Sequence, residues 1–197
     1  MAAPDVFIIE SLRFEDESGD RLEGKTLSNI LRLAGKNPAC YYIRTKLELS
    51  KILHIFDNSD YRYLHFSFHG GSDGLDLTLE TLTNRELYNI ISPHIDKKRI
   101  FFSSCEYPSA ELASHVFKNT DAYSLAGPTG KIRFDKSAAM WAAFYVAMFS
   151  KDPNKMQHSV LFKTLRKLSG LFDEELSYYR RNTKKPHFRK HSITPVD

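Results

Sequence analysis

Short apolar runs alternate along this chain with longer segments whose apolar residues recur at helical spacing. The runs predict five strands, at 6–9, 40–43, 63–68, 99–103 and 122–127. Helical spacing predicts helices at 26–34, 47–56, 83–91, 109–117, 137–149, 156–168 and 174–180. Strands that alternate with helices are typical of a mostly parallel sheet with helices on both faces, a three-layer α/β sandwich.

Two segments between these elements have other patterns. The segment 14–24 is polar and acidic, so we expect a loop or a short hairpin there. Residues 74–79 alternate with a period of two, which predicts a small β ribbon. The third and fourth predicted strands therefore have a ribbon and a helix between them.

The chain of 197 residues is long enough for one domain with a sizeable core, and it contains no internal repeat or flexible linker. We expect a single domain over residues 1–180, followed by a basic tail at 181–197. Residues 180–191 carry six Lys or Arg and no acid. This stretch is either a phosphate-binding or docking arm or a solvated tail, and we favour the tail.

Charge and composition exclude several classes of protein. The net charge of +4 is modest and indicates no specific nucleic-acid site. Two cysteines form no disulfide framework and have no metal-site spacing. The first residues lack a secretory signal pattern, and the longest apolar run, 138–149, is too short to cross a bilayer. We therefore expect a cytoplasmic protein without a membrane partner. Glycine-rich nucleotide-binding motifs are absent from the sequence.

Two reactive residues lie at the carboxyl ends of predicted strands, where open α/β sheets bind their ligands. His69 closes the third strand, and Cys105 follows the fourth. If the strands are neighbours, the imidazole can accept the thiol proton or stabilise the thiolate. The backbone N–H groups of Gly70 and Cys105 could then hold an oxyanion. The opposing interpretation is a buried small cysteine and a turn histidine, and we interpret Cys40 as core packing.

The same two segments resemble a known family. Residues 63–70, Tyr-Leu-His-Phe-Ser-Phe-His-Gly, resemble the apolar strand and His-Gly of caspase-fold peptidases. Residues 100–106, Ile-Phe-Phe-Ser-Ser-Cys-Glu, resemble the strand and Ser-Ala-Cys-Glu of CHAT domains, the caspase-like branch shared with separase. The similarity covers residues 60–150, but Ser104 replaces the usual Ala, and 130–135 lacks the usual Trp.

The resemblance implies a caspase-like cysteine endopeptidase that needs no metal or organic cofactor. His69 would be the base or ion-pair partner, and Cys105 the nucleophile. Separase-like relatives bind a basic substrate side chain with an acidic residue, and Asp135 lies in the corresponding segment, with Glu106 and Asp73 as lesser candidates. Asp135 could instead cap a helix that begins near residue 137, and Asp73 could belong to a turn.

The resemblance also implies partners. We expect a protein substrate and an activating partner or assembly, because CHAT proteins usually carry further modules and none is visible here. The family context is bacterial antiviral defence or programmed cell death. The alternative is a catalytically inactive caspase-fold scaffold, since a fold does not fix a function. A pseudoenzyme should have lost one residue of the dyad, so the presence of His69 and Cys105 favours the enzyme.

Overall fold

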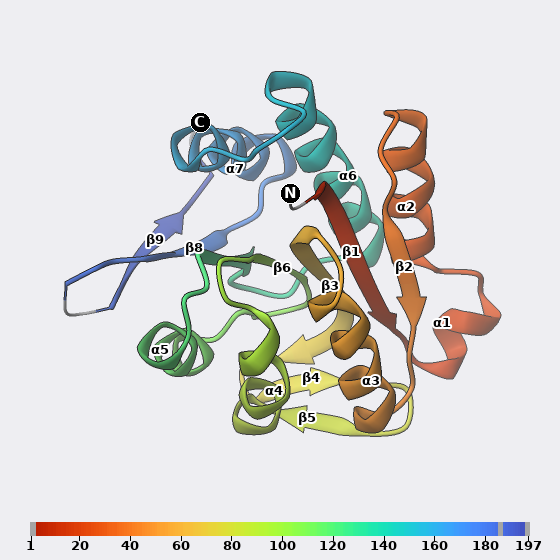
Figure 1. Cartoon of the computed structure of the whole chain (residues 1–197). Helices are drawn as coiled ribbons and strands as arrows, with labels where there is room; N and C mark the ends of the chain where they lie inside the picture. Colours follow the sequence, from red (N-terminus) through yellow and green to blue (C-terminus); the bar gives the residue numbers. More distant parts are fainter. Residues whose placement is uncertain (1–2, 185–186, 196–197) are drawn as a thin grey trace.

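Five parallel strands form the centre of the sheet, and they correspond to the five apolar runs of the sequence (Figure 1). The computed structural model of the chain describes residues 3–184 and 187–195. In spatial order the five strands are β2 (Ala39–Tyr42), β1 (Ala3–Ser11), β3 (Tyr61–Gly71), β6 (Arg99–Ser103) and β7 (Ser124–Pro128).

Two antiparallel strands extend the sheet beyond β7. They are β8 (Leu176–Arg181) and β9 (Phe188–Ile193). The prediction of a helix at 174–180 is therefore wrong. Tyr178 packs into the core on one face of the sheet, and Tyr179 packs into the core on the other face. That alternation belongs to a strand, and pairing with β7 outweighs the helical spacing.

The basic stretch that we expected to be a solvated tail contributes largely to this hairpin. Arg180 pairs with Arg189, and Tyr179 pairs with Lys190, across β8 and β9. Residues 185–186 and 196–197 lie outside the described residues. Backbone pairing explains why this stretch forms strands although it is highly charged. On an edge strand the charged side chains can point to solvent while the main chain forms hydrogen bonds with the neighbouring strand.

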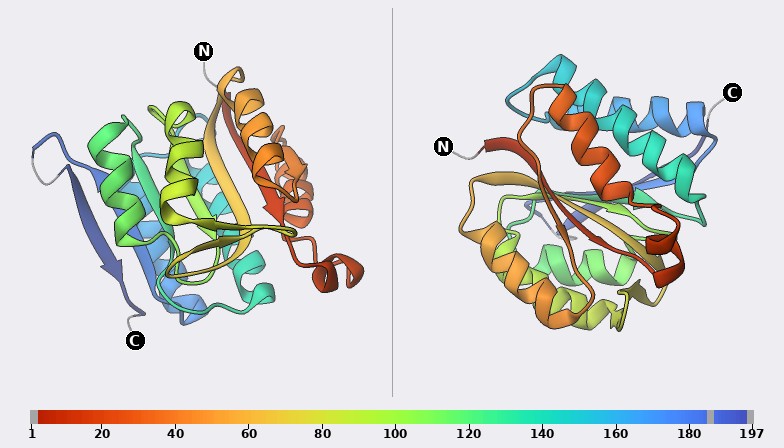
Figure 2. Two further views of the ribbon diagram at one scale, coloured as in Figure 1. Left: turned by 90° about the horizontal axis from the view of Figure 1, so that it is seen from below. Right: turned by 90° about the vertical axis from the view of Figure 1, so that its right-hand side faces the viewer.

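Helices cover both faces of the sheet, and the right-hand view of Figure 2 shows the sheet between the two helical layers. One layer contains α2 (Glu23–Leu33), α6 (Phe134–Lys151) and α7 (His158–Phe172). The other contains α3 (Lys46–Asp57), α4 (Asn84–Ile91) and α5 (Ala110–Asn119). Alongside these layers are a short helix, α1 (Phe14–Ser18), in the segment expected to be a loop or hairpin, and a 3-10 turn, Ser92–His94. The three-layer sandwich predicted from the sequence is confirmed.

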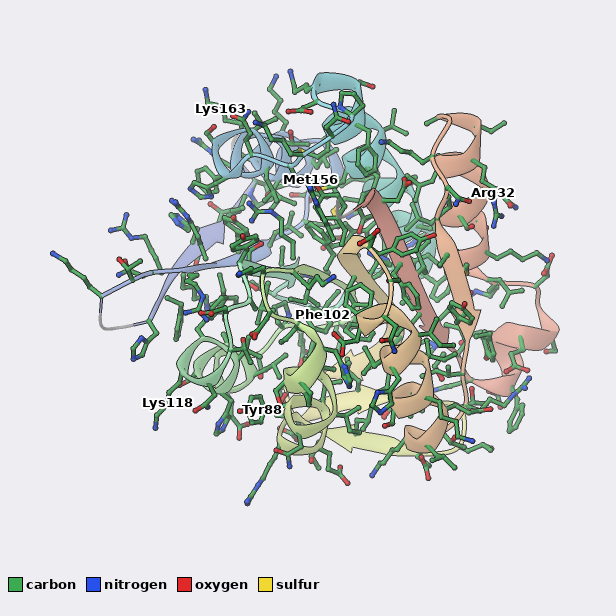
Figure 3. The ribbon with its side chains drawn as sticks, viewed as in Figure 1. Arg32, Tyr88, Phe102, Lys118, Met156 and Lys163 are labelled. Atoms are coloured by element: carbon green, nitrogen blue, oxygen red, sulfur yellow. The ribbon has the colours of Figure 1, made fainter. Side chains whose placement is uncertain are left out.

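Alternating strand residues separate the two cores. Phe7 and Phe102 point into the core under α3, α4 and α5. Val6 and Phe101 point into the core under α2, α6 and α7. Phe102, labelled in Figure 3, lies at the middle of the molecule. Strands buried on both faces are nearly continuous apolar runs, which is why the sequence revealed them clearly.

A small ribbon extends from the carboxyl end of β3. It consists of β4 (Gly74–Asp76) and β5 (Thr81–Thr83), and β4 pairs with the last residues of β3. The Thr83–Glu86 capping box that follows begins α4, as the sequence predicts. Among the residues described, no helix is both long enough and apolar enough to cross a membrane.

Candidate active site

His69 and Cys105 line one cavity at the carboxyl edge of the sheet. His69 lies near the end of β3, and Cys105 follows β6 by two residues. The strands are parallel neighbours in which Ser67 pairs with Ser103, so both residues emerge at the same edge. The cavity has a volume of about 220 Å³, and its lining comprises Arg21, Glu23, Phe68, His69, Ser103, Ser104, Cys105, Ile132, Phe134 and Ser137.

The imidazole of His69 is held by a carboxylate that the sequence reasoning missed. His69 Nε2 lies 2.6 Å from Oδ2 of Asp16, a residue of α1 whose side chain is only 8% exposed. Arg21 Nη1 donates to the other oxygen, Oδ1, at 2.7 Å. An ionised carboxylate can only accept, so Nε2 donates this hydrogen bond and, in the neutral imidazole, Nδ1 carries the lone pair. Nδ1 is thereby left to accept a proton from a nucleophile.

The thiol of Cys105 has a different hydrogen-bond partner. Its Sγ lies 3.6 Å from the carbonyl oxygen of Ile132 and donates to it. The neighbouring residue Glu106 has a φ of 58°, in the left-handed region, and its N–H donates to the Gly130 carbonyl at 3.0 Å. The chain therefore turns sharply just after the thiol, and this turn keeps Cys105 at the cavity rather than in the core.

Gly70 allows a close approach between the two strand ends. A Cβ at Gly70 would lie 2.8 Å from Leu75 Cδ2 and 3.3 Å from Ser104 Cβ. The backbone after His69 therefore packs directly beside the residue that precedes Cys105. The expectation that the N–H groups of Gly70 and Cys105 act at one reacting carbonyl stays a prediction.

A buried carboxyl, Glu23 of α2, also lines the cavity and was likewise missed. Ser103 Oγ donates to its Oε1 at 2.6 Å, and Ser67 Oγ donates to its Oε2 at 3.0 Å. Burial raises the pKa of Glu23 to about 8. Glu10, at the end of β1, accepts the N–H of Gly24 at 2.7 Å, and burial raises its pKa to about 7. Glu10 follows the apolar run 6–9, so the strand-end rule could have found it. Glu23 follows no strand, and its local sequence carries no such signal.

The three acidic residues that the sequence offers as substrate-binding candidates do not line the cavity of His69 and Cys105. Asp135 is 68% exposed and binds Arg133 at 2.8 Å, which lowers the pKa of its carboxyl. It lines a neighbouring pocket of about 610 Å³ that shares Arg21, Glu23 and Phe134 with the cavity. The helix begins at Phe134 with Arg133 as its N-cap, three residues earlier than expected, so Asp135 lies in its first turn.

Asp73 belongs to the turn between β3 and β4, and Glu106 belongs to the loop after β6. Glu106 Oε2 accepts the Ser72 N–H at 3.2 Å, and Asp73 Oδ1 accepts the Ser72 hydroxyl at 3.2 Å. Neither residue lines the cavity of His69 and Cys105. Over the described ranges, no group of three or more His, Cys, Asp or Glu side chains is arranged to hold a metal ion.

Comparisons with solved structures find similar folds in several cysteine proteases. A search against protein families finds no match, and neither does a search of curated proteins. An inactive zymogen C11 protease from Parabacteroides distasonis is similar with a TM-score of 0.59 at 12% identity, over 91% of this chain and 62% of that one. Caspase-1 from Spodoptera frugiperda is similar with a TM-score of 0.56 at 14% identity, over 98% of this chain and 85% of that one. The Arg-specific cysteine proteinase gingipain R is similar with a TM-score of 0.53 at 11% identity, over 84% of this chain and 41% of that one.

The similarity to these structures shows the fold alone, because the sequence identities are only 11–14%. The chain spans less than two thirds of the C11 protease and gingipain chains. The similarity in fold nevertheless extends over 91% of this chain for the C11 protease and 98% for caspase-1. The chain has a caspase-like fold.

Proposed function

We propose that this protein is a cysteine endopeptidase of the caspase and CHAT type. The observation that carries the proposal is that His69 and Cys105, from neighbouring parallel strands, line one cavity while Asp16 engages Nε2 of the imidazole. The order of groups, carboxylate, imidazole and thiol, is the arrangement that activates a nucleophile in acyl transfer.

The geometry supports a two-step reaction. The Cys105 thiol gives its proton to His69 Nδ1, and the thiolate attacks the scissile carbonyl carbon. The N–H groups of Gly70 and Cys105 donate to the oxyanion, and Asp16 stabilises the imidazolium. The tetrahedral intermediate expels the amine, which takes the proton from His69. Water then attacks the thioester with His69 as base, and Cys105 regains its proton.

We further propose a preference for a basic side chain before the scissile bond. Glu23 supports this preference, because its carboxyl borders the cavity and a cation that entered would compensate the cost of ionising it. The walls contributed by Phe68, Ile132 and Phe134 suit an aliphatic stem. Asp135, in the adjoining pocket, is the second candidate for this role, and Glu106 and Asp73 are the weaker ones.

The setting of the enzyme is also a proposal. We place it in the cytoplasm, where it would cleave a protein substrate after activation by a partner or by assembly, in bacterial defence or cell death. A need for activation fits the hydrogen bond of the thiol, because Cys105 donates to the Ile132 carbonyl and not to the imidazole of His69 in this structure. A shift of the 130–135 segment would release the thiol toward the imidazole.

That same contact favours the second candidate function, an inactive caspase-fold scaffold. Hydrolysis of fluorogenic peptides ending in Arg, Lys or Asp separates the two functions, with Cys105→Ala as the test and Cys40→Ala as the matched cysteine control. The enzyme loses all turnover in Cys105→Ala and keeps it in Cys40→Ala. Absence of turnover with every peptide, alone and in every assembly state, would support the scaffold.

A further inference from the structure

A second pocket lies between α2 and the edge strand β2, on the right-hand side of the molecule in Figure 1. Its volume is about 540 Å³, and it shares no lining residue with the cavity of His69 and Cys105. This size falls within the range of pockets that hold small molecules and cofactors. The pocket is open to solvent at the sheet edge, so a ligand can bind there without contacting Cys105.

Two cations in this pocket lack a strong partner in the protein. Lys25 lies 3.9 Å from Asp20, at an exposed ion pair of little strength. Arg32, labelled in Figure 3 on α2, forms no ion pair with any acidic side chain of the described residues. Both side chains lie on one helix, where positions seven residues apart share a face. The positive charges of Lys25 and Arg32 therefore lie at the same opening of the pocket.

The acidic side chains of the pocket are already engaged. Glu17 accepts from Arg44 at 3.0 Å and from the Tyr42 hydroxyl. Glu10 is turned toward the backbone and accepts the N–H groups of Gly24 at 2.7 Å and Lys25 at 3.3 Å. Neither carboxylate pairs with Arg32, so the unbalanced charge of the pocket is positive.

A buried hydroxyl points independently to a missing ligand atom. Ser28 is only 1% exposed, lines the pocket and has no hydrogen-bond partner for its Oγ. Buried polar groups in folded proteins are nearly always paired, so an orphan hydroxyl next to an open pocket marks a place for an acceptor oxygen. Ser28 lies one helical turn from both Lys25 and Arg32, so the three residues share one face of α2 and line the same pocket.

Cys40 completes the pocket as an apolar surface rather than a reactive group. Burial raises the pKa of its thiol to about 11. It therefore stays protonated at neutral pH and packs like a small hydrophobe. With Leu22 and the ring of Tyr42 it offers an apolar patch beside the charged one.

We propose that this pocket binds a small organic phosphate. Arg32 matches phosphate oxygens with two parallel N–H donors, Lys25 contributes a point charge, and Ser28 donates its hydroxyl. The organic part lies on Leu22, Cys40 and Tyr42. This site is distinct from the proposed protease site, and its occupancy can be measured whether or not the chain cleaves peptides.

Isothermal titration calorimetry with adenosine 5′-monophosphate tests the proposal on the full chain. We expect heat of binding with the nucleotide and with inorganic phosphate, and none with neutral adenosine. Lys25→Glu with Arg32→Glu should weaken binding at least about tenfold. The charge-matched control, Lys51→Glu with Arg85→Glu on α3 and α4, should leave the affinity within about twofold. Circular dichroism checks that each variant is folded.

Ser28→Ala and Arg32→Gln provide the second arm, because neither adds a charge that could disturb folding. Each should weaken nucleotide binding about threefold or more. No binding of either phosphate at millimolar concentration overturns the proposal. So does an equal loss in the control pair, which would indicate only a general effect of charge. Succinate bound more tightly than the phosphates would make the site a carboxylate site and overturn the assignment.

Discussion

Asp16 and His69 are 53 residues apart in the sequence, yet Asp16 Oδ2 lies 2.6 Å from His69 Nε2. The pair joins a short helix after β1 to the end of β3, across the edge of the sheet where the cavity opens. Arg21 secures the other carboxylate oxygen at 2.7 Å, and its guanidinium lies 4.8 Å from the centre of the Phe134 ring. The orientation of the imidazole therefore depends on a small set of contacts outside the dyad itself.

Asp16→Asn should lower kcat about a hundredfold with little change in KM, because the amide cannot stabilise the imidazolium. Asp16→Glu should recover part of the loss. The measurement is steady-state hydrolysis of a fluorogenic peptide across a pH series, with Glu15→Gln in the same helix as the control. A wild-type kcat and pH profile in Asp16→Asn would show that Asp16 only holds α1 in place.

Glu23→Gln should reduce selectivity for basic peptides while Cys105 remains reactive. At neutral pH the raised pKa of Glu23, about 8, keeps its carboxyl mostly protonated in the empty cavity, so Gln is a close mimic of the neutral side chain. We expect kcat/KM for Arg peptides to fall about 10- to 100-fold relative to Leu peptides.

Asp135→Asn is the matched comparison, because Asp135 is the other acid proposed to bind a basic side chain. Its exposed position and its pairing with Arg133 predict the smaller effect. If selectivity disappears in Asp135→Asn and persists in Glu23→Gln, the specificity residue is Asp135, as the sequence resemblance implies.

Gly127→Ala should destabilise the protein strongly. A Cβ there would lie 2.1 Å from the carbonyl oxygen of Tyr107, a backbone atom that cannot move without displacing the turn after Cys105. We expect a loss of about 2–4 kcal/mol in the free energy of unfolding, together with lower activity. Gly130→Ala, where nothing lies within 4 Å of the added Cβ, is the control for denaturant melts. Equal stability of the two variants would contradict this packing.

The sequence revealed the parts of the structure that depend on local pattern. The Thr83–Glu86 capping box correctly marked the start of α4, and buried strands appeared as apolar runs. His69 and Cys105 could be proposed because strand ends in a parallel sheet meet at one edge. Asp16 and Glu23 could not, because they lie in the acidic segment 14–24, whose composition indicates only a loop or a short hairpin. Their roles follow from contacts with His69, Ser67 and Ser103, which only the folded chain creates.

The contribution of His158 to the free energy of unfolding should rise with pH between about 4 and 6.5. Its pKa in the folded protein is lowered to about 4 from the ordinary 6.5, first by burial and then by Arg180. Between those values the unfolded chain binds a proton at His158 that the folded chain does not, so the contribution of His158 to stability is fully present above pH 6.5 and is lost as the pH falls. His158→Gln should flatten this part of a melting-temperature profile. An unchanged slope in His158→Gln would contradict the assignment.

The central claim is that the imidazole of His69 activates the thiol of Cys105, and the rate at which a thiol-reactive peptide probe labels each cysteine tests it most directly. Mass spectrometry distinguishes Cys105 from Cys40, which serves as the internal reference. We predict that Cys105 is labelled much faster than Cys40 and that His69→Ala lowers its rate about a hundredfold while Cys40 is unaffected. A Cys105 that reacts no faster than an ordinary free thiol, or at the same rate with and without His69, would contradict the account.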